Sequence, residues 1–148
     1  MESAELQLRP PRHQVSRRAI TWWTVQAVLS VLPLLVPVLV GLLTWHDARS
    51  PLAWAAAAVV LLGGVYVVVM SRWRFRIHRW EATEDAVYTS AGWLSQEWRV
   101  APMSRIQTVD TVRGPLQQLL GLSTVTVTTA SAAGPLQVKG IDHRELAP

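Results

Sequence analysis

The chain has 148 residues, half of them hydrophobic, and its 14 basic and 10 acidic residues give a net charge of +4. It contains no cysteine, which excludes disulfide bonds, thiolate metal sites and a cysteine nucleophile. Apolar residues are concentrated in positions 20–70, whereas positions 71–148 carry the mixed charges of a small soluble domain. That second part is long enough to hold one small hydrophobic core.

Two uncharged apolar runs dominate the first half of the chain. Residues 1–16 are polar and predict a flexible tail. Residues 20–43 and 52–70 contain no Asp, Glu, Lys, Arg or His, and a helix that crosses a bilayer needs about 20 such residues. We therefore predict two transmembrane helices within residues 17–71, joined by the short loop 44–51. A cleaved signal peptide is disfavoured, because the first run is longer than a signal core and a second run follows almost at once.

Arginines flank the two runs on one side of the predicted hairpin. Of the 14 basic residues 13 are Arg; four precede the first run, four follow the second, and the connecting loop has no net charge. Because basic residues stay on the cytoplasmic side during insertion, we expect both termini in the cytoplasm. The flanking residues are Arg9, Arg12, Arg17, Arg18, Arg72, Arg74, Arg76 and Arg79.

The second half predicts about five short strands with tight turns, in a meandering antiparallel sheet or small barrel. Residues 72–83 alternate apolar side chains with Arg and His, which is typical of a half-buried strand. Gly114 and Pro115 predict a break before a helical turn that ends at Gly121. Asp142 is the expected N-cap of a last helix. A turn is expected at residues 90–92, and the other expected strands lie around residues 93–100, 105–112, 123–130 and 136–141.

The three arginines that follow the second run are candidates for contact with anionic lipid. Arg72, Arg74 and Arg76 occupy every second position, so on a strand their side chains would share one face, with His78 exposed beside them. Each could attract anionic headgroups by about 1 kcal/mol. Alternatively they act only as a stop-transfer signal that sets the topology. The two interpretations are compatible.

No motif for catalysis or metal binding is present. The four histidines lie in separate segments without metal-ligand spacing, and no nucleophile elbow or phosphate-binding glycine loop occurs. Nucleic-acid binding is disfavoured because residues 71–148 carry nine basic and seven acidic residues. We expect neither an enzyme nor a bound cofactor or metal ion.

Four stretches in the second half carry a resemblance to a known family. They are WRFRIHRWEAT, GWLSQEWRVAP, PMSRIQTVDTVRGPLQQLLGL and TVTVTTASAAG. In this order, and behind two spans, they resemble the bacterial pleckstrin-homology (PH) domain family of YdbS-like membrane proteins. The resemblance extends over about residues 17–142.

This resemblance implies a PH-like fold in residues 72–148: a strongly bent antiparallel sheet, or partial barrel, capped by a C-terminal helix. Residues 142–148 hold only a truncated form of that helix, so the chain is either a natural short form or a fragment. The resemblance also implies the bacterial cytoplasmic membrane as location. Its motif residues have mainly structural roles, although Arg105 could pair with Asp110 or with an acidic partner. They are Pro102, Arg105, Ile106, Gln107, Asp110, Gly114, Pro115, Gly121 and Leu122.

Two functions follow as hypotheses. The first is a non-enzymatic, membrane-anchored binding or scaffolding module that binds a protein partner or self-associates at the cytoplasmic membrane surface. The second is a subunit of an oligomeric transport, export or channel assembly. Spans without charged residues argue against an ion pathway through one subunit, which favours the first hypothesis.

Overall fold

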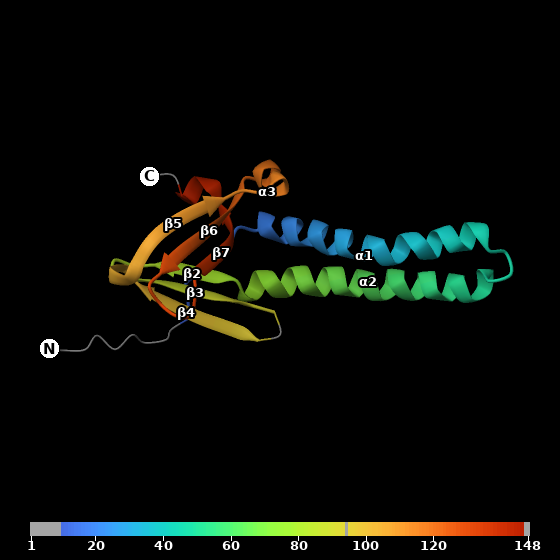
Figure 1. Ribbon diagram of the computed structural model, residues 1–148, viewed down its shortest axis with the longest axis horizontal. Coiled ribbons are helices and arrows are strands. Elements are labelled where there is room, and N and C mark those ends of the chain that lie inside the picture. The colour runs from blue at the N-terminus through green and yellow to red at the C-terminus, as the bar shows by residue number, and fades with distance from the viewer. Residues whose placement is uncertain (1–9, 94, 147–148) are drawn as a thin grey trace. The chain divides into compact units, whose positions relative to one another are not determined.

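The structure is a computed structural model that describes residues 10–93 and 95–146. It divides into two compact units (Figure 1). The helical hairpin contains residues 20–73. The sheet unit contains the described residues up to Ala19 together with those from Arg74 onward. Each unit is described by itself.

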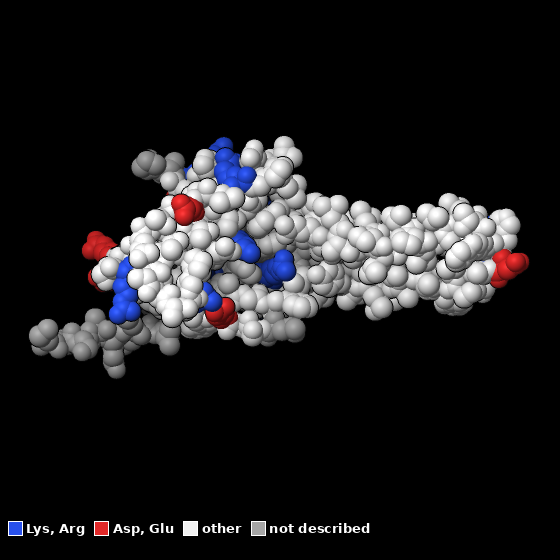
Figure 2. All heavy atoms as spheres, viewed as in Figure 1, with Lys and Arg blue, Asp and Glu red and all other residues white. Residues whose placement is uncertain are grey.

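The two predicted spans are long helices, α1 (Arg18–Thr44) and α2 (Arg49–Ile77). Their apolar segments are almost entirely unburied, and the visible face of the hairpin carries few charged side chains (Figure 2). Leu34, Leu61 and Leu62 are 64%, 69% and 68% exposed. A helix in the core of a soluble protein would bury such side chains, whereas hydrocarbon solvates them. The length, composition and exposure of both helices therefore match membrane spans.

Small and polar side chains join the two helices of the hairpin. A Cβ atom added at Gly63 of α2 would lie 2.9 Å from Cγ1 of Val31 in α1, so glycine permits this close approach. Towards the other end, the hydroxyl oxygens of Thr24 and Ser71 lie 3.0 Å apart, and Ser71 donates to the carbonyl of Val67. Such hydrogen bonds satisfy hydroxyl groups away from water.

A four-stranded antiparallel sheet forms the first half of the sheet unit, in the order β1-β2-β3-β4. Its strands are β1 (His13–Gln14), β2 (Arg79–Ala82), β3 (Ala86–Gly92) and β4 (Gln96–Pro102). The single turn η1 (Met103–Arg105) connects it to the second sheet.

The second sheet has three antiparallel strands in the order β5-β6-β7. They are β5 (Ile106–Val112), β6 (Leu122–Thr129) and β7 (Leu136–Asp142). In β6 the valines are buried and the threonines between them are half-buried, as the alternation of its sequence predicts. The short turn η2 (His143–Leu146) follows β7. The core of the unit consists of Ala101, Val125, Val127, Leu136, Val138 and Ile141, with Trp80, Ile106 and Leu146 packed against it.

Helix α3 (Pro115–Leu120) lies between β5 and β6, where a helical turn was predicted. Pro115 occupies its first position, and Gly121 ends it in the left-handed conformation with φ of 69°. The side chain of Gln117 accepts a hydrogen bond from the Gly114 amide at 3.0 Å and donates to Thr124 at 2.8 Å. A buried glutamine therefore fixes α3 onto β6.

These observations confirm the predicted fold class: two apolar helices, then antiparallel sheets that do not close into a barrel, and a short C-terminal helix. One expected element is wrong. Residues 72–77 are not a strand but the last turns of α2, and the His78 amide still donates to the Arg74 carbonyl at 2.9 Å. A continuous helix keeps its backbone hydrogen bonds internal where the chain leaves an apolar environment, and this outweighs the two-residue alternation. The described residues form seven strands rather than about five.

The expected tail of residues 1–16 also needs correction, because its described part is folded. His13 and Gln14 pair with β2 as β1, and the Ser16 amide donates to the Gly140 carbonyl at 3.0 Å. Val15 is buried, and Ala19 just beyond it is completely so. These apolar side chains complete the packing of the sheet unit. A domain that began at residue 72 would lack them. Residues 1–9 lie outside the described part of the chain.

Candidate functional site

The arginines that follow the second apolar run lie on a helix, which changes their arrangement. At 100° per residue, Arg72 and Arg76 lie on one side of α2, and Arg74 lies on the opposite side. The expectation that all three share one face is therefore wrong. Arg72 and Arg76 are exposed, and Arg74 is half-buried. Arg74 and Arg76 also complement the negative end of the helix dipole in its last turn.

His78 follows α2 directly and was expected to be exposed, but it is half-buried. Its Nδ1 atom lies 2.9 Å from the carbonyl oxygen of Arg74. Burial lowers the pKa of His78 from 6.5, and the nearby charges of Arg74 and Lys139 lower this pKa further. The hydrogen bond to the Arg74 carbonyl raises this pKa and opposes the other effects only in part.

The family-like motif residues define corners and caps of the sheet unit. Leu122 is completely buried at the start of β6. The polar members Arg105, Gln107 and Asp110 are exposed. Among the described residues no ion pair joins Arg105 to Asp110; the ion pairs are Arg12–Glu81, Arg18–Asp142 and Arg99–Glu97. Pro102 ends β4, Arg105 ends η1, Ile106, Gln107 and Asp110 lie on β5, and Gly114, Pro115 and Gly121 bound α3.

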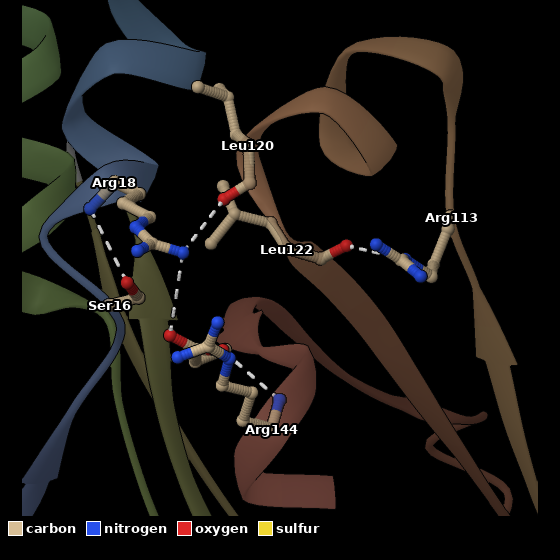
Figure 3. A network of polar contacts seen from close by, with 7 residues as sticks. Ser16, Arg18, Arg113, Leu120, Leu122 and Arg144 are labelled. Carbon is tan, nitrogen blue, oxygen red and sulfur yellow. Dashed lines mark hydrogen bonds and ion pairs between the residues drawn. The ribbon is translucent and has the colours of Figure 1, made fainter.

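Arg18 forms a polar network that the sequence did not predict (Figure 3). Its Nη1 atom donates to the Leu120 carbonyl at 3.5 Å and lies 3.9 Å from Oδ2 of Asp142. The other carboxylate oxygen of Asp142 accepts a hydrogen bond from the Arg144 amide at 3.0 Å, which confirms Asp142 as a cap. Arg18 thus links the start of α1 to the ends of α3 and β7.

One Ser–His pair lies outside any predicted motif. Oγ of Ser123 is 3.3 Å from Nδ1 of His143, but Ser123 is completely buried, so a substrate could not reach this hydroxyl. The pair instead joins β6 to η2. Within residues 10–93 and 95–146, no three His, Asp or Glu side chains are grouped so that they could hold a metal ion.

β5 is a long and largely exposed edge strand of the sheet unit. β5 pairs with β6 alone in its sheet, and all its residues except Ile106 are exposed. Val109 stands opposite Val127, which is 4% exposed in the core, yet Val109 itself is 60% exposed. Directly opposite residues share a sheet face, so the core-facing side of the second sheet is uncovered at β5. Val112 on the same strand is 61% exposed.

Comparisons with known proteins agree with this architecture. The model of the family described as "Bacterial PH domain" matches residues 20–147. The UPF0699 transmembrane protein YdbS of Bacillus subtilis (strain 168) is 30% identical over 124 residues, which cover 82% of this chain and 78% of the relative. No solved structure matches the chain significantly. With two apolar helices ahead of the antiparallel sheets, and a family match over most of its length, the chain belongs to the bacterial PH domain family of membrane proteins.

Proposed function

We propose that this protein is a non-enzymatic, membrane-anchored module whose sheet unit binds an extended segment of a partner protein along the edge of β5. The single observation that carries the proposal is the exposure of β5, which combines an edge unpaired within its sheet with the exposed Val109 and Val112. Soluble proteins usually protect such an edge with charge, proline or a covering element. An added strand would pair with the backbone and flank Val109 on the core-facing side of the sheet and Val112 on the opposite side.

The proposed orientation places both termini and the sheet unit in the cytoplasm. The arginine distribution around the two spans supports it. Cysteine labelling can test this cleanly, because the natural chain has no cysteine. A cysteine at exposed Ala132 should react with a membrane-impermeant maleimide only after the cells are opened. A cysteine at Asp47, in the loop between the helices, should react in intact spheroplasts.

We further propose that Arg72, Arg74 and Arg76 contact anionic headgroups. On the helix Arg72 and Arg76 share one side and Arg74 lies on the opposite side, so the three would meet lipids on two sides of α2 rather than form one patch. Their combined attraction would be about 3 kcal/mol at low salt. Replacing them by Gln in the full chain should reduce enrichment of phosphatidylglycerol around the protein in mixed nanodiscs.

The β5 proposal is tested by photo-crosslinking in native membranes. A photoreactive amino acid at Thr108 should give crosslinked species in the otherwise natural chain. The double variant Val109→Lys, Val112→Lys should remove these species, because it puts a charge on each face of the edge strand, where charged side chains oppose the addition of a strand. The control Gln137→Lys adds the same kind of charge at an exposed position on β7 and should retain them.

Mass spectrometry of the crosslinked bands distinguishes a second protein from a second copy of this chain. Crosslinks that persist unchanged in the double-lysine variant would refute β5 as the binding edge. If crosslinks form only between copies of this chain, then β5 binds a second copy of the chain rather than another protein.

A further inference from the structure

A polar pocket lies where the end of α2 meets the first sheet. Its volume is about 300 Å³, at the lower limit of small-molecule sites. The polar and charged side chains that line it come from five elements: α2, β1, β2, β3 and β4. They are Gln14, Arg76, Arg79, Ser90 and Gln96.

The strand register explains why these residues come together. Gln14 of β1 stands opposite Arg79 of β2, and Arg79 stands opposite Ser90 of β3. Directly opposite residues in antiparallel strands point to the same face, so these three form a row across the sheet. The Gln96 amide donates to Oγ of Ser90 at 3.0 Å, which positions a further polar group beside the row.

The two arginines of the pocket have no carboxylate partner among the described residues. The nearby acidic residues of this sheet are engaged elsewhere: Glu81 with Arg12, and Glu97 with Arg99 at 2.6 Å. Two guanidinium groups thus face a cavity that is lined by no carboxylate from residues 10–93 or 95–146. Such a donor-rich cavity suits an anion with several oxygen atoms, since guanidinium binds phosphate with paired hydrogen bonds.

A structural role alone accounts for only part of this arrangement. Arg76 could simply complement the helix dipole in the last turn of α2. That role needs neither Arg79 on the neighbouring strand nor the Gln–Ser pair beside it.

The position of Arg76 along α2 sets which phosphates can reach it. It lies six residues after Met70, the end of the uncharged run, or about 9 Å along the helix axis. The headgroup layer extends roughly 5–8 Å beyond each side of the hydrocarbon core. Arg76 thus follows the predicted span closely along the chain, and both a lipid headgroup phosphate and a soluble phosphate are candidate ligands.

We propose that this pocket binds a phosphate group through Arg76 and Arg79, with Ser90 and Gln96 as additional hydrogen-bonding groups. This goes beyond the protein association proposed above and does not depend on it. It shares Arg76 with the headgroup contacts proposed above, whereas Arg79 lies outside that set, so Arg79→Gln tests the pocket by itself. The phosphate belongs either to an anionic lipid headgroup or to a soluble phosphate, and the chemistry of recognition is the same for both.

The test uses the full chain in nanodiscs. In phosphatidylcholine nanodiscs, inorganic phosphate is titrated calorimetrically at constant ionic strength. In nanodiscs with equal phosphatidylcholine and phosphatidylglycerol, native mass spectrometry measures which lipid stays bound after release. The variants are Arg79→Gln and Arg76→Gln, with Arg144→Gln as a control that removes one exposed charge away from the pocket. Gln96→Ala leaves every charge in place, and thermal unfolding verifies that each variant is folded.

We expect Arg79→Gln and Arg76→Gln to weaken binding of the responding probe about tenfold or more, Gln96→Ala to weaken it several-fold, and Arg144→Gln to change it less than twofold. Saturable inorganic phosphate binding identifies a soluble ligand, and selective phosphatidylglycerol retention identifies a headgroup. Binding of neither probe by the natural chain overturns the proposal. Equal weakening by Arg144→Gln also overturns it, because attraction would then reflect net charge alone. The double-lysine variant of β5 should bind phosphate normally, which separates this result from the proposed function.

Discussion

At the scale of single residues, His78 couples protonation to stability. Its pKa is lowered by burial and by nearby positive charge, so the unfolded chain binds this proton more tightly than the folded one. The free energy of unfolding should therefore fall as pH drops through 6.5, the ordinary value. We expect His78→Gln to lose less thermal stability between pH 7.5 and 5.5 than the natural chain does. His143→Gln, at an exposed histidine, is the control, and identical pH profiles for all three proteins would contradict the prediction.

A second residue-scale prediction concerns Gly140, which has φ of 84° and contacts the N-terminal segment. A Cβ atom there would lie 2.7 Å from Cβ of Ala19. Gly134 has a similar φ of 78°, but a Cβ atom there would meet open space. A substitution at Gly134 therefore measures backbone strain alone, whereas one at Gly140 adds the steric clash with Ala19. We expect Gly134→Ala to cost about 1 kcal/mol and Gly140→Ala roughly 2–4 kcal/mol. The change in melting temperature measures both, and equal shifts would show that the contact with Ala19 contributes nothing.

At the scale of elements, two adjacent glycines in α2 test how the hairpin packs. A Cβ at Gly63 would meet Val31 at 2.9 Å, whereas a Cβ at Gly64 would have no neighbour within 4 Å. Alanine is the better helix former by about 1 kcal/mol in either position. We therefore expect Gly64→Ala to be neutral or stabilising and Gly63→Ala to destabilise the hairpin by about 1–2 kcal/mol. Unfolding in mixed detergent micelles measures the difference, and stabilisation by both substitutions would refute this packing.

At the scale of the whole molecule, the sheet unit combines residues that precede the helical hairpin in the sequence with residues that follow it. Val15 is only 3% exposed, because it is buried in the sheet unit. A charge at this position should therefore disrupt the packing of strands that lie far along the chain. We expect Val15→Asp to destabilise the sheet unit by about 3 kcal/mol or more, whereas Ala132→Asp in an exposed turn should have little effect. Hydrogen exchange in nanodiscs should show faster exchange in β2 and β7 of the first variant. Unchanged exchange there would mean that residues 10–19 are dispensable for the unit.

The residues of the proposed phosphate pocket could be predicted from the sequence only in part. Arg76 belongs to the arginine set that the sequence singled out beside the membrane. Ser90 and Gln96 had no recognisable signal, because only the strand register places them near Arg79. The folded N-terminal segment was missed for the same reason: the hydrogen bond from Ser16 to Gly140 joins residues 124 positions apart.

Local residue patterns are enough to predict the two membrane helices, because a helix in lipid needs an unbroken apolar run whatever the rest of the chain does. They are also enough to predict α3 and β6, where Pro, Gly and alternating β-branched residues act over a few neighbours. Three features become visible only in the folded chain: α2 continues through Ile77, His78 is half-buried, and residues 13–19 complete the sheet unit. These features depend on which distant surfaces cover a segment, and a local pattern of polar and apolar residues carries no information about that.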